Sequence, residues 1–215
     1  MATGIVLADD HKIFREGVRS LLDQHLDLKV LGEADDGRNA VDLVRQLSPQ
    51  VVILDVTMPI LNGIDAARRI LAASPDVKVI ALSMHSHQSL VQEMLRAGAS
   101  GYLLKECAFE ELVQAIHSVL GGKIYLSSEI TRMVLGGYLQ TSRKRERPDA
   151  SSLAPKEREV LQLLAEGKTT GEIAQLLHMS GRTVEKYRSQ IMKKLNIHNL
   201  AGLTKFAIRE GLTKP

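Results

Sequence analysis

The fold is decided by one short stretch, Val51-Val52-Ile53-Leu54-Asp55. Its run of apolar residues shows no polar alternation, which predicts a strand that is buried on both faces. Strands of this kind belong to parallel sheets that helices cover on both sides. The run ends at a carboxylate, and in such sheets the ligand site lies beyond the carboxyl ends of the strands. We therefore expect an α/β domain with Asp55 at its functional edge.

Further strand candidates flank this stretch along the first half of the chain. The segments between them place apolar residues at the helical spacing i, i+3 and i+4, as at Val18, Leu21 and Leu22. This alternation predicts a doubly wound α/β fold with a five-stranded parallel sheet. The expected strands are Ile5–Ala8, Lys29–Ala34, Val51–Asp55, Val77–Ser83 and Gly101–Leu104.

The length of the chain predicts a second domain. At 215 residues it exceeds the roughly 100–150 residues of a typical domain. A helix is expected from Ser128 to about Leu139, and the polar stretch Thr141–Ser152 is typical of a linker. We therefore expect an N-terminal domain over residues 1–121, a linker region with a helix over 122–152, and a C-terminal domain over 153–215.

The net charge also differs between the two halves of the chain. Residues 1–140 carry 13 Lys and Arg against 17 Asp and Glu, a net charge of −4, whereas residues 141–215 carry 15 against 8, a net charge of +7. Together these give the net charge of +3 for the whole chain. A basic second half is typical of a domain that binds a polyanion, although a solvated basic surface is the simpler alternative.

Several classes of protein are disfavoured by composition. No apolar run approaches the roughly 20 residues of a membrane span, and the N-terminus lacks the features of a signal peptide. The single cysteine, Cys107, cannot form an internal disulfide, and no Cys/His cluster has zinc spacing. We therefore expect a cytoplasmic protein without a membrane partner.

Charged and polar residues stand where the expected strands end. They are Asp9 and Asp10 after the first strand, Asp55 at the end of the third, Ser83 at the end of the fourth and Lys105 after the fifth. Because these ends gather at one edge of the sheet, the residues are expected to share one pocket. Three carboxylates at close range repel one another, so a cation is expected among them. Oxygen ligands with open positions suit Mg²⁺.

Each of these residues also has a purely structural explanation. Asp9 or Asp10 can cap the helix that follows, and Asp55 can be a turn residue at the end of its strand. A single serine or lysine at such a position is unremarkable. Their joint occurrence, in this order and at these strand ends, favours the shared pocket.

The N-terminal half resembles the receiver domain of response regulators, which has a flavodoxin-like fold. The motifs that carry the resemblance are Ala8-Asp9-Asp10-His11, Asp55-Val56-Thr57-Met58-Pro59 with Asn62-Gly63, Leu82-Ser83 and Gly101-Tyr102-Leu103-Leu104-Lys105. The spacing Asp-x-x-Met-Pro-x-x-x-Gly is the most specific of them. Pro59 and Gly63 are expected to shape the loop so that Asp55 is exposed beside the metal.

The resemblance implies a phosphorylation switch that uses a phosphodonor, not an enzyme that turns over a substrate. Asp55 would accept a phosphoryl group from a sensor histidine kinase. Asp10 and Asp55 would bind Mg²⁺ together with the backbone carbonyl of Thr57, and Asp9 would act mostly through water.

The remaining pocket residues would respond to the transfer. Lys105 would stabilise the negative oxygens, Ser83 would hydrogen-bond the new phosphoryl oxygen, and Tyr102 would rotate inward.

Two positions depart from the family pattern. Glu106 stands where many receivers have proline, and a cis bond there would cost about 3–4 kcal/mol more than a trans bond. Met84 stands where a small residue is common, and we expect it to shield the phosphoryl group from water.

The C-terminal half has a helical pattern throughout. Its expected helices are Pro155–Glu166, Thr169–Leu177, Arg182–Leu195 and Asn199–Arg209. A tight turn, His178-Met179-Ser180-Gly181, joins the second and third, which predicts a helix-turn-helix whose second helix enters the major groove of DNA. On that helix Val184, Ile191 and Leu195 would face the core. The charged residues elsewhere on it would otherwise form an ordinary solvated face.

Residues 153–212 resemble the LuxR-type output domain of the NarL/FixJ response regulators. The matching segments are Leu153-x-Pro155-x-Glu157-Arg158-Glu159-Val160-Leu161, Ala165-x-Gly167, Glu172-Ile173-Ala174, Thr183-Val184-Glu185 and Lys193-Lys194-Leu195. The resemblance places Glu185, Lys186 and Ser189 at positions that face bases. It places Arg182, Thr183, Arg188 and Lys193 near phosphates. Glu185 departs from relatives that have a basic residue there, and it can accept a hydrogen bond from a cytosine amino group.

The expected partners are therefore a sensor histidine kinase, promoter DNA and a second copy of the chain, with RNA polymerase as a further candidate. We expect dimers to form through Asn199–Arg209 when the chain is phosphorylated or bound to DNA. In the unphosphorylated chain the acidic half would cover Lys186 and its neighbours. The stimulus, the target promoters and the sign of regulation do not follow from the sequence.

Four alternatives fit less well. A haloacid-dehalogenase-type phosphatase needs a second acid two residues after its nucleophile, and Thr57 stands there. A nucleotide-binding domain needs a glycine-rich loop after its first strand, where Asp9-Asp10-His11 stands instead. A regulator that works without phosphorylation usually lacks a residue of the acid pocket, and an autoinducer sensor would need a different front domain.

Overall fold

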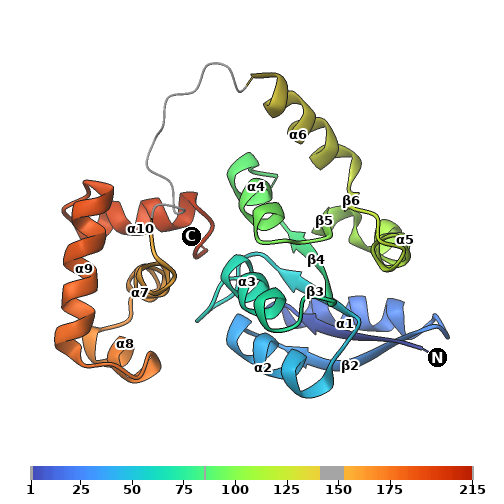
Figure 1. Cartoon of the computed structure of the whole chain (residues 1–215), viewed down its shortest axis with the longest axis horizontal. Coiled ribbons are helices and arrows are strands. Elements are labelled where there is room, and N and C mark those ends of the chain that lie inside the picture. Colours follow the sequence, from blue (N-terminus) through green and yellow to red (C-terminus); the bar gives the residue numbers. More distant parts are fainter. Residues whose placement is uncertain (1, 85, 141–152, 215) are drawn as a thin grey trace.

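The computed structural model describes residues 2–84, 86–140 and 153–214, which form two domains that lie against each other (Figure 1). The N-terminal domain is an α/β unit and the C-terminal domain is helical. The expected linker Thr141–Ser152 lies outside the described residues. Within the ranges that are described, no helix is both long and apolar enough to cross a membrane.

A parallel sheet lies at the centre of the N-terminal domain, with the strand order β2-β1-β3-β4-β5-β6. Its strands are β1 (Thr3–Ala8), β2 (Leu28–Ala34), β3 (Val51–Asp55), β4 (Lys78–Ser83), β5 (Gly101–Leu104) and β6 (Tyr125–Leu126). The strands expected from the sequence are all present. The chain turns from one side of β1 to the other between β2 and β3, and the crevice that binds ligands in such sheets opens at this point.

The sixth strand was not expected. Tyr125 and Leu126 pair with Gly101 and Tyr102 at the edge of β5, so the prediction of a five-stranded sheet is wrong by one strand. Helix α6 (Ser128–Gln140) follows and buries Ile130 against the same domain. Residues 125–134 thus pack on the N-terminal domain, because their apolar side chains complete its core.

Helices cover both faces of the sheet. On one face lie α1 (Lys12–Leu22) and α5 (Ala108–Leu120), and on the other lie α2 (Gly37–Leu47), α3 (Gly63–Ala73), α4 (Gln88–Arg96) and α6. The apolar run of β3 serves both layers, with Val51 and Ile53 in one core and Val52 and Leu54 in the other. This double burial explains why the run shows no polar alternation.

The C-terminal domain consists of α7 (Pro155–Ala165), α8 (Thr170–Leu176), α9 (Gly181–Leu195) and α10 (Leu200–Arg209). Each expected helix is present, and side-chain caps begin three of them. Thr169, Ser180 and Asn199 accept hydrogen bonds from backbone N–H groups in the first turns of α8, α9 and α10. Buried leucine, isoleucine and valine side chains from all four helices form a separate core.

Candidate functional site

Carboxylates at the ends of β1 and β3 meet a lysine that follows β5. Lys105 Nζ lies 2.6 Å from Asp9 Oδ2 and 2.9 Å from Asp55 Oδ2, and all three side chains are buried. The ring of Phe14 lies beneath the ammonium, 4.8 Å from Nζ, which holds Lys105 in place through a cation–π contact. The predicted convergence of Asp9, Asp55 and Lys105 is therefore what the sheet produces.

Asp55 lies in an environment that disfavours its charge. Only 1% of the residue is exposed. Its pKa is raised to about 6, because the effect of burial, together with the nearby Asp9 carboxylate, exceeds the lowering by Lys105. The expectation that Asp55 is exposed is wrong for this arrangement, because side chains around the pocket close over it.

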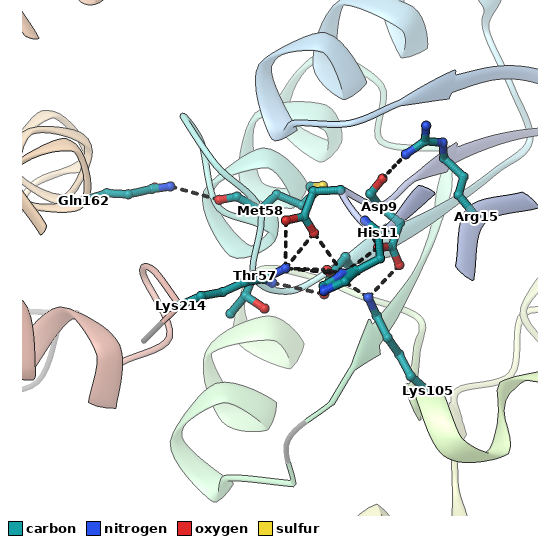
Figure 2. Close-up of polar contacts among 10 residues, drawn as sticks. Asp9, His11, Arg15, Thr57, Met58, Lys105, Gln162 and Lys214 are labelled. Carbon is teal, nitrogen blue, oxygen red and sulfur yellow. Dashed lines mark hydrogen bonds and ion pairs between the residues drawn. The ribbon is translucent and has the colours of Figure 1, made fainter. Parts of the chain in front are cut away.

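Asp10 has a different environment at the mouth of the pocket. Burial alone would raise its pKa, but hydrogen bonds and charge from Lys214, together with His11, hold the pKa below its usual value. His11 Nδ1 lies 3.1 Å from Asp10 Oδ1 and 3.2 Å from Asp9 Oδ1. Figure 2 shows His11 and Lys214 reaching the same cluster from opposite domains.

The donor set of the pocket fits a divalent cation. One ligand atom each from Asp9, Asp10, His11 and Asp55 lies within 4.8 Å of the others. The carboxylates supply oxygen ligands, which Mg²⁺ prefers. Two ammonium groups, those of Lys105 and Lys214, face three carboxylates here, so the pocket is one positive charge short. The residues present therefore fit the magnesium site that the strand ends predict.

The loop after β3 passes directly over Asp55. A Cβ atom at Gly63 would lie 2.0 Å from the Asp55 backbone oxygen, so only glycine allows α3 to begin there. The Thr57 N–H donates to Asp55 Oδ1 at 3.2 Å, which orients the carboxylate. Within the loop, Ile60 has a φ of +66°, a strained conformation for a β-branched residue.

Ser83 and Tyr102 meet behind the pocket. Their side chains are hydrogen-bonded, and burial raises the pKa of Tyr102 to about 12. The Tyr102 side chain is already fully buried, so the inward position does not require a phosphoryl group. Beyond Ser83, Met84 is largely exposed. The Lys105–Glu106 peptide bond is trans and begins a short 3₁₀ helix, Lys105–Cys107.

The second candidate site is the outer face of α9. Val184, Ile191 and Leu195 are buried in the domain core, as expected. The opposite face is exposed at Arg182, Glu185, Lys186, Ser189 and Lys193, and partly exposed at Thr183 and Arg188. Thr170 of α8 donates a hydrogen bond to Glu185 Oε1 at 2.7 Å, which fixes this carboxylate on the face.

Comparisons with known proteins identify both halves. The profile of the response regulator receiver domain matches residues 5–117, and that of the bacterial regulatory proteins of the luxR family matches residues 151–207. The chain belongs to the NarL/FixJ family of response regulators. It is thus a two-component response regulator with a receiver domain and a LuxR-type DNA-binding domain.

Relatives match this response regulator over nearly its whole length. The response regulator UvrY of Escherichia coli K12 is 38% identical over 97% of this chain and 94% of its own. The nitrate/nitrite response regulator NarL of the same strain is 33% identical over 90% of this chain and 89% of its own. A structure of two RcsB dimers bound to two parallel DNAs has a TM-score of 0.60 at 29% identity, covering 97% and 99%.

In this response regulator the two domains meet through α7. Arg158 Nε donates to Asp65 Oδ1 at 2.9 Å, and both side chains are buried. Gln162 Oε1 accepts from the Asn62 N–H at 3.0 Å. Figure 2 shows the second contact of Gln162, in which its Nε2 donates to the carbonyl of Met58 at 3.0 Å. The loop beside Asp55 is therefore held by the output domain.

The recognition helix takes no part in this interface as far as the described contacts go. Lys186 is exposed, so the expectation that the receiver covers it is wrong for this arrangement. The receiver meets α7, the end of α8 through Arg38 and the turn after α10. The charges of α9 predict a binding surface from the sequence alone. His11 lies in the Ala8-Asp9-Asp10-His11 motif without a role of its own, and Lys214 lies in no recognisable pattern.

Proposed function

We propose that Asp55 is the phosphoacceptor of this response regulator and that a sensor histidine kinase supplies the phosphoryl group. The observation that carries the proposal is the meeting of Asp55 with Lys105 and Asp9 at the carboxyl edge of the sheet. A metal bound at this site would neutralise charge on the transferred group. Asp10, Asp55 and the carbonyl of Thr57 would hold it, with Asp9 acting mostly through water.

The chain's own residues position the reaction. Lys105 fixes a positive charge beside Asp55 and stabilises the negative oxygens of the transferred group. The Thr57 N–H orients the accepting carboxylate. Ser83 exchanges its hydrogen bond with Tyr102 for one to the new phosphoryl oxygen, which changes the contacts of the Tyr102 ring. Met84 restricts the approach of water.

The assignment is tested by labelling with a small phosphodonor in the presence of Mg²⁺. We expect Asp55→Asn to abolish labelling, and stable labelling of that variant would refute the assignment. Met84→Ala should shorten the half-life of the phosphorylated chain, and an unchanged half-life would exclude shielding by Met84.

We propose further that α9 reads promoter DNA in the major groove. In this proposal Glu185, Lys186 and Ser189 face base edges, while Arg182, Thr183, Arg188 and Lys193 bind phosphates. The support is a charged, exposed helix face on a LuxR-type domain, together with the DNA-bound dimers of RcsB. A dimer would combine two half-sites, and α10 offers the exposed Leu200 for pairing.

Phosphorylation would then act on the docked arrangement. A phosphoryl group on Asp55 adds charge beneath the contacts of Gln162 and Lys214, and we propose that this favours undocking and pairing. The full chain should bind promoter DNA much better when phosphorylated, measured at one salt concentration. Equal affinity of the two forms would refute regulation by docking but not DNA binding.

A further inference from the structure

The last turn of the chain enters the receiver. After α10, Gly211 adopts a φ of +67° and packs against Leu90 of α4, where an added Cβ would lie 2.1 Å from Leu90 Cδ2. Leu212 is buried in the core of the output domain. Two residues later, the side chain of Lys214 points into the acid pocket (Figure 2). Both domains therefore fix the place of this lysine.

The ammonium group of Lys214 contacts both carboxylate oxygens of Asp10. Its Nζ lies 2.6 Å from Asp10 Oδ1 and 2.8 Å from Oδ2. It also lies 3.8 Å from Asp55 Oδ2 and 3.4 Å from His11 Nδ1. The ammonium group thus sits among three of the four residues whose ligand atoms cluster at this site.

Charge explains why a lysine is stable here. Asp9, Asp10 and Asp55 are three carboxylates, and Lys105 alone leaves them two positive charges short. Lys214 supplies one of these, at a position where a hydrogen-bonded ammonium contacts both oxygens of Asp10. A cation that coordinates Asp10 and Asp55 needs the same oxygens. The Lys214 ammonium and Mg²⁺ repel each other and need the same oxygens, so only one of the two can bind Asp10 and Asp55 at a time.

We propose that Lys214 is a tethered cation that takes the place of Mg²⁺ and links metal binding to undocking of the output domain. The inference rests on the proposed function of the pocket. Because linkage is reciprocal, Mg²⁺ weakens docking by the factor by which docking weakens Mg²⁺ binding. The docked chain is then kept unphosphorylated in two ways, since its phosphoacceptor is covered and its metal site is filled.

Calorimetric titration of the full unphosphorylated chain with Mg²⁺ tests the competition. Lys214→Gln should lower the Kd for Mg²⁺ about fivefold or more, whereas Lys214→Arg, which keeps the charge, should stay close to the parent. Lys205→Gln is the matched control, because Lys205 is exposed on α10. An unchanged Kd in Lys214→Gln would overturn the proposal.

Carbodiimide crosslinking tests the contact itself, because this reagent joins an amine to a carboxylate that lies against it. We expect a Lys214–Asp10 crosslink in the absence of Mg²⁺ and its loss at saturating Mg²⁺. Lys194 and Glu157, 2.7 Å apart within the output domain, provide an internal control that Mg²⁺ leaves unchanged. A missing Lys214 crosslink, or a yield that is independent of Mg²⁺, would overturn the proposal.

Mg²⁺ binding and labelling of Asp55 together distinguish the role of Lys214 from the function of the pocket. If Lys214 variants bind Mg²⁺ as the parent does, while Mg²⁺-dependent labelling still requires Asp55, only the competition is wrong. If no variant binds Mg²⁺ and Asp55 is not labelled, the proposed function fails together with it.

Discussion

Helices α7 and α9 are both rich in charge but differ in what their charges meet. On α7, Glu157, Arg158 and Glu159 are buried, and Arg158 pairs with Asp65 of the receiver. On α9, Glu185 and Lys186 remain exposed. The charges of α7 are satisfied within the chain, so they hold the docked state together. The exposed charges of α9, such as that of Lys186, face solvent and are the ones that we propose to meet DNA.

The largest expected effect comes from breaking the buried ion pair of α7. Removing one partner of such a pair costs about 3–5 kcal/mol, because the other charge is left unpaired. Arg158→Ala should therefore accelerate hydrogen exchange of the Asn62 amide, which donates across the interface, by about a hundredfold or more.

Two companion variants sharpen this test. Asp65→Asn breaks the same pair from the receiver side and leaves Arg158 in its contact with the Leu153 carbonyl. Arg182→Ala removes a charge from α9 and should leave exchange at Asn62 unchanged. If Arg158→Ala and Asp65→Asn also leave it unchanged, the ion pair does not hold the domains together.

The converse effect is expected on α9. Lys186→Ala should weaken binding of the phosphorylated chain to promoter DNA by about 1–3 kcal/mol, the value of a specific base contact. Exchange at Asn62 should not change, because Lys186 lies away from the docking contacts. Lys205→Ala provides a basic, exposed control on α10. Equal losses in both variants would indicate general electrostatic attraction without base recognition by Lys186.

A smaller effect is expected at Ile60, the receiver residue whose N–H donates to Glu166 at the end of α7. Asparagine tolerates a positive φ better than a β-branched residue does. Ile60→Asn should therefore raise the free energy of unfolding of the receiver by about 1 kcal/mol in denaturant titrations. Ile124→Asn, at an exposed position with ordinary backbone, should give no such gain.

The smallest effect is a dependence of docking on pH through Glu166. Burial raises its pKa above the usual 4.5, and a hydrogen bond from Gln162 offsets only part of the rise. A raised pKa means that the docked state favours the protonated carboxyl. This contribution to docking is complete below 4.5 and is lost as the pH rises through the raised value.

The measurement is again hydrogen exchange at Asn62. Glu166→Gln, which resembles the protonated form, should slow the exchange severalfold at neutral pH, after correction for the intrinsic effect of pH. It should also remove the dependence on pH just above 4.5. Faster exchange in the variant would show that the carboxylate stabilises docking.

The sequence predicts the pocket better than the interface for a physical reason. Asp9, Asp55 and Lys105 follow buried strands, and the topology of a parallel sheet brings strand ends together whatever the surrounding side chains are. Hydrophobic spacing likewise predicts the core face of α9. These inferences depend on local patterns and on one topological rule.

Docking depends on how two surfaces fit across a linker, and no local pattern encodes it. Gln162 and Lys214 look like ordinary surface residues, and their partners Asn62 and Asp10 lie 100 and 204 positions away. The burial of Tyr102 was missed for a similar reason. Its surroundings include β6, and a strand of two residues is too short to show an alternating pattern.

That short strand has a consequence for self-association. An unpaired sheet edge presents free N–H and carbonyl groups that template pairing with another chain. Here Tyr125 and Leu126 occupy the edge of β5, and Ile130 of α6 covers the apolar surface beside it. A fragment ending at residue 121 would expose both the edge and that surface. Such a receiver fragment should aggregate more readily than one that ends after α6.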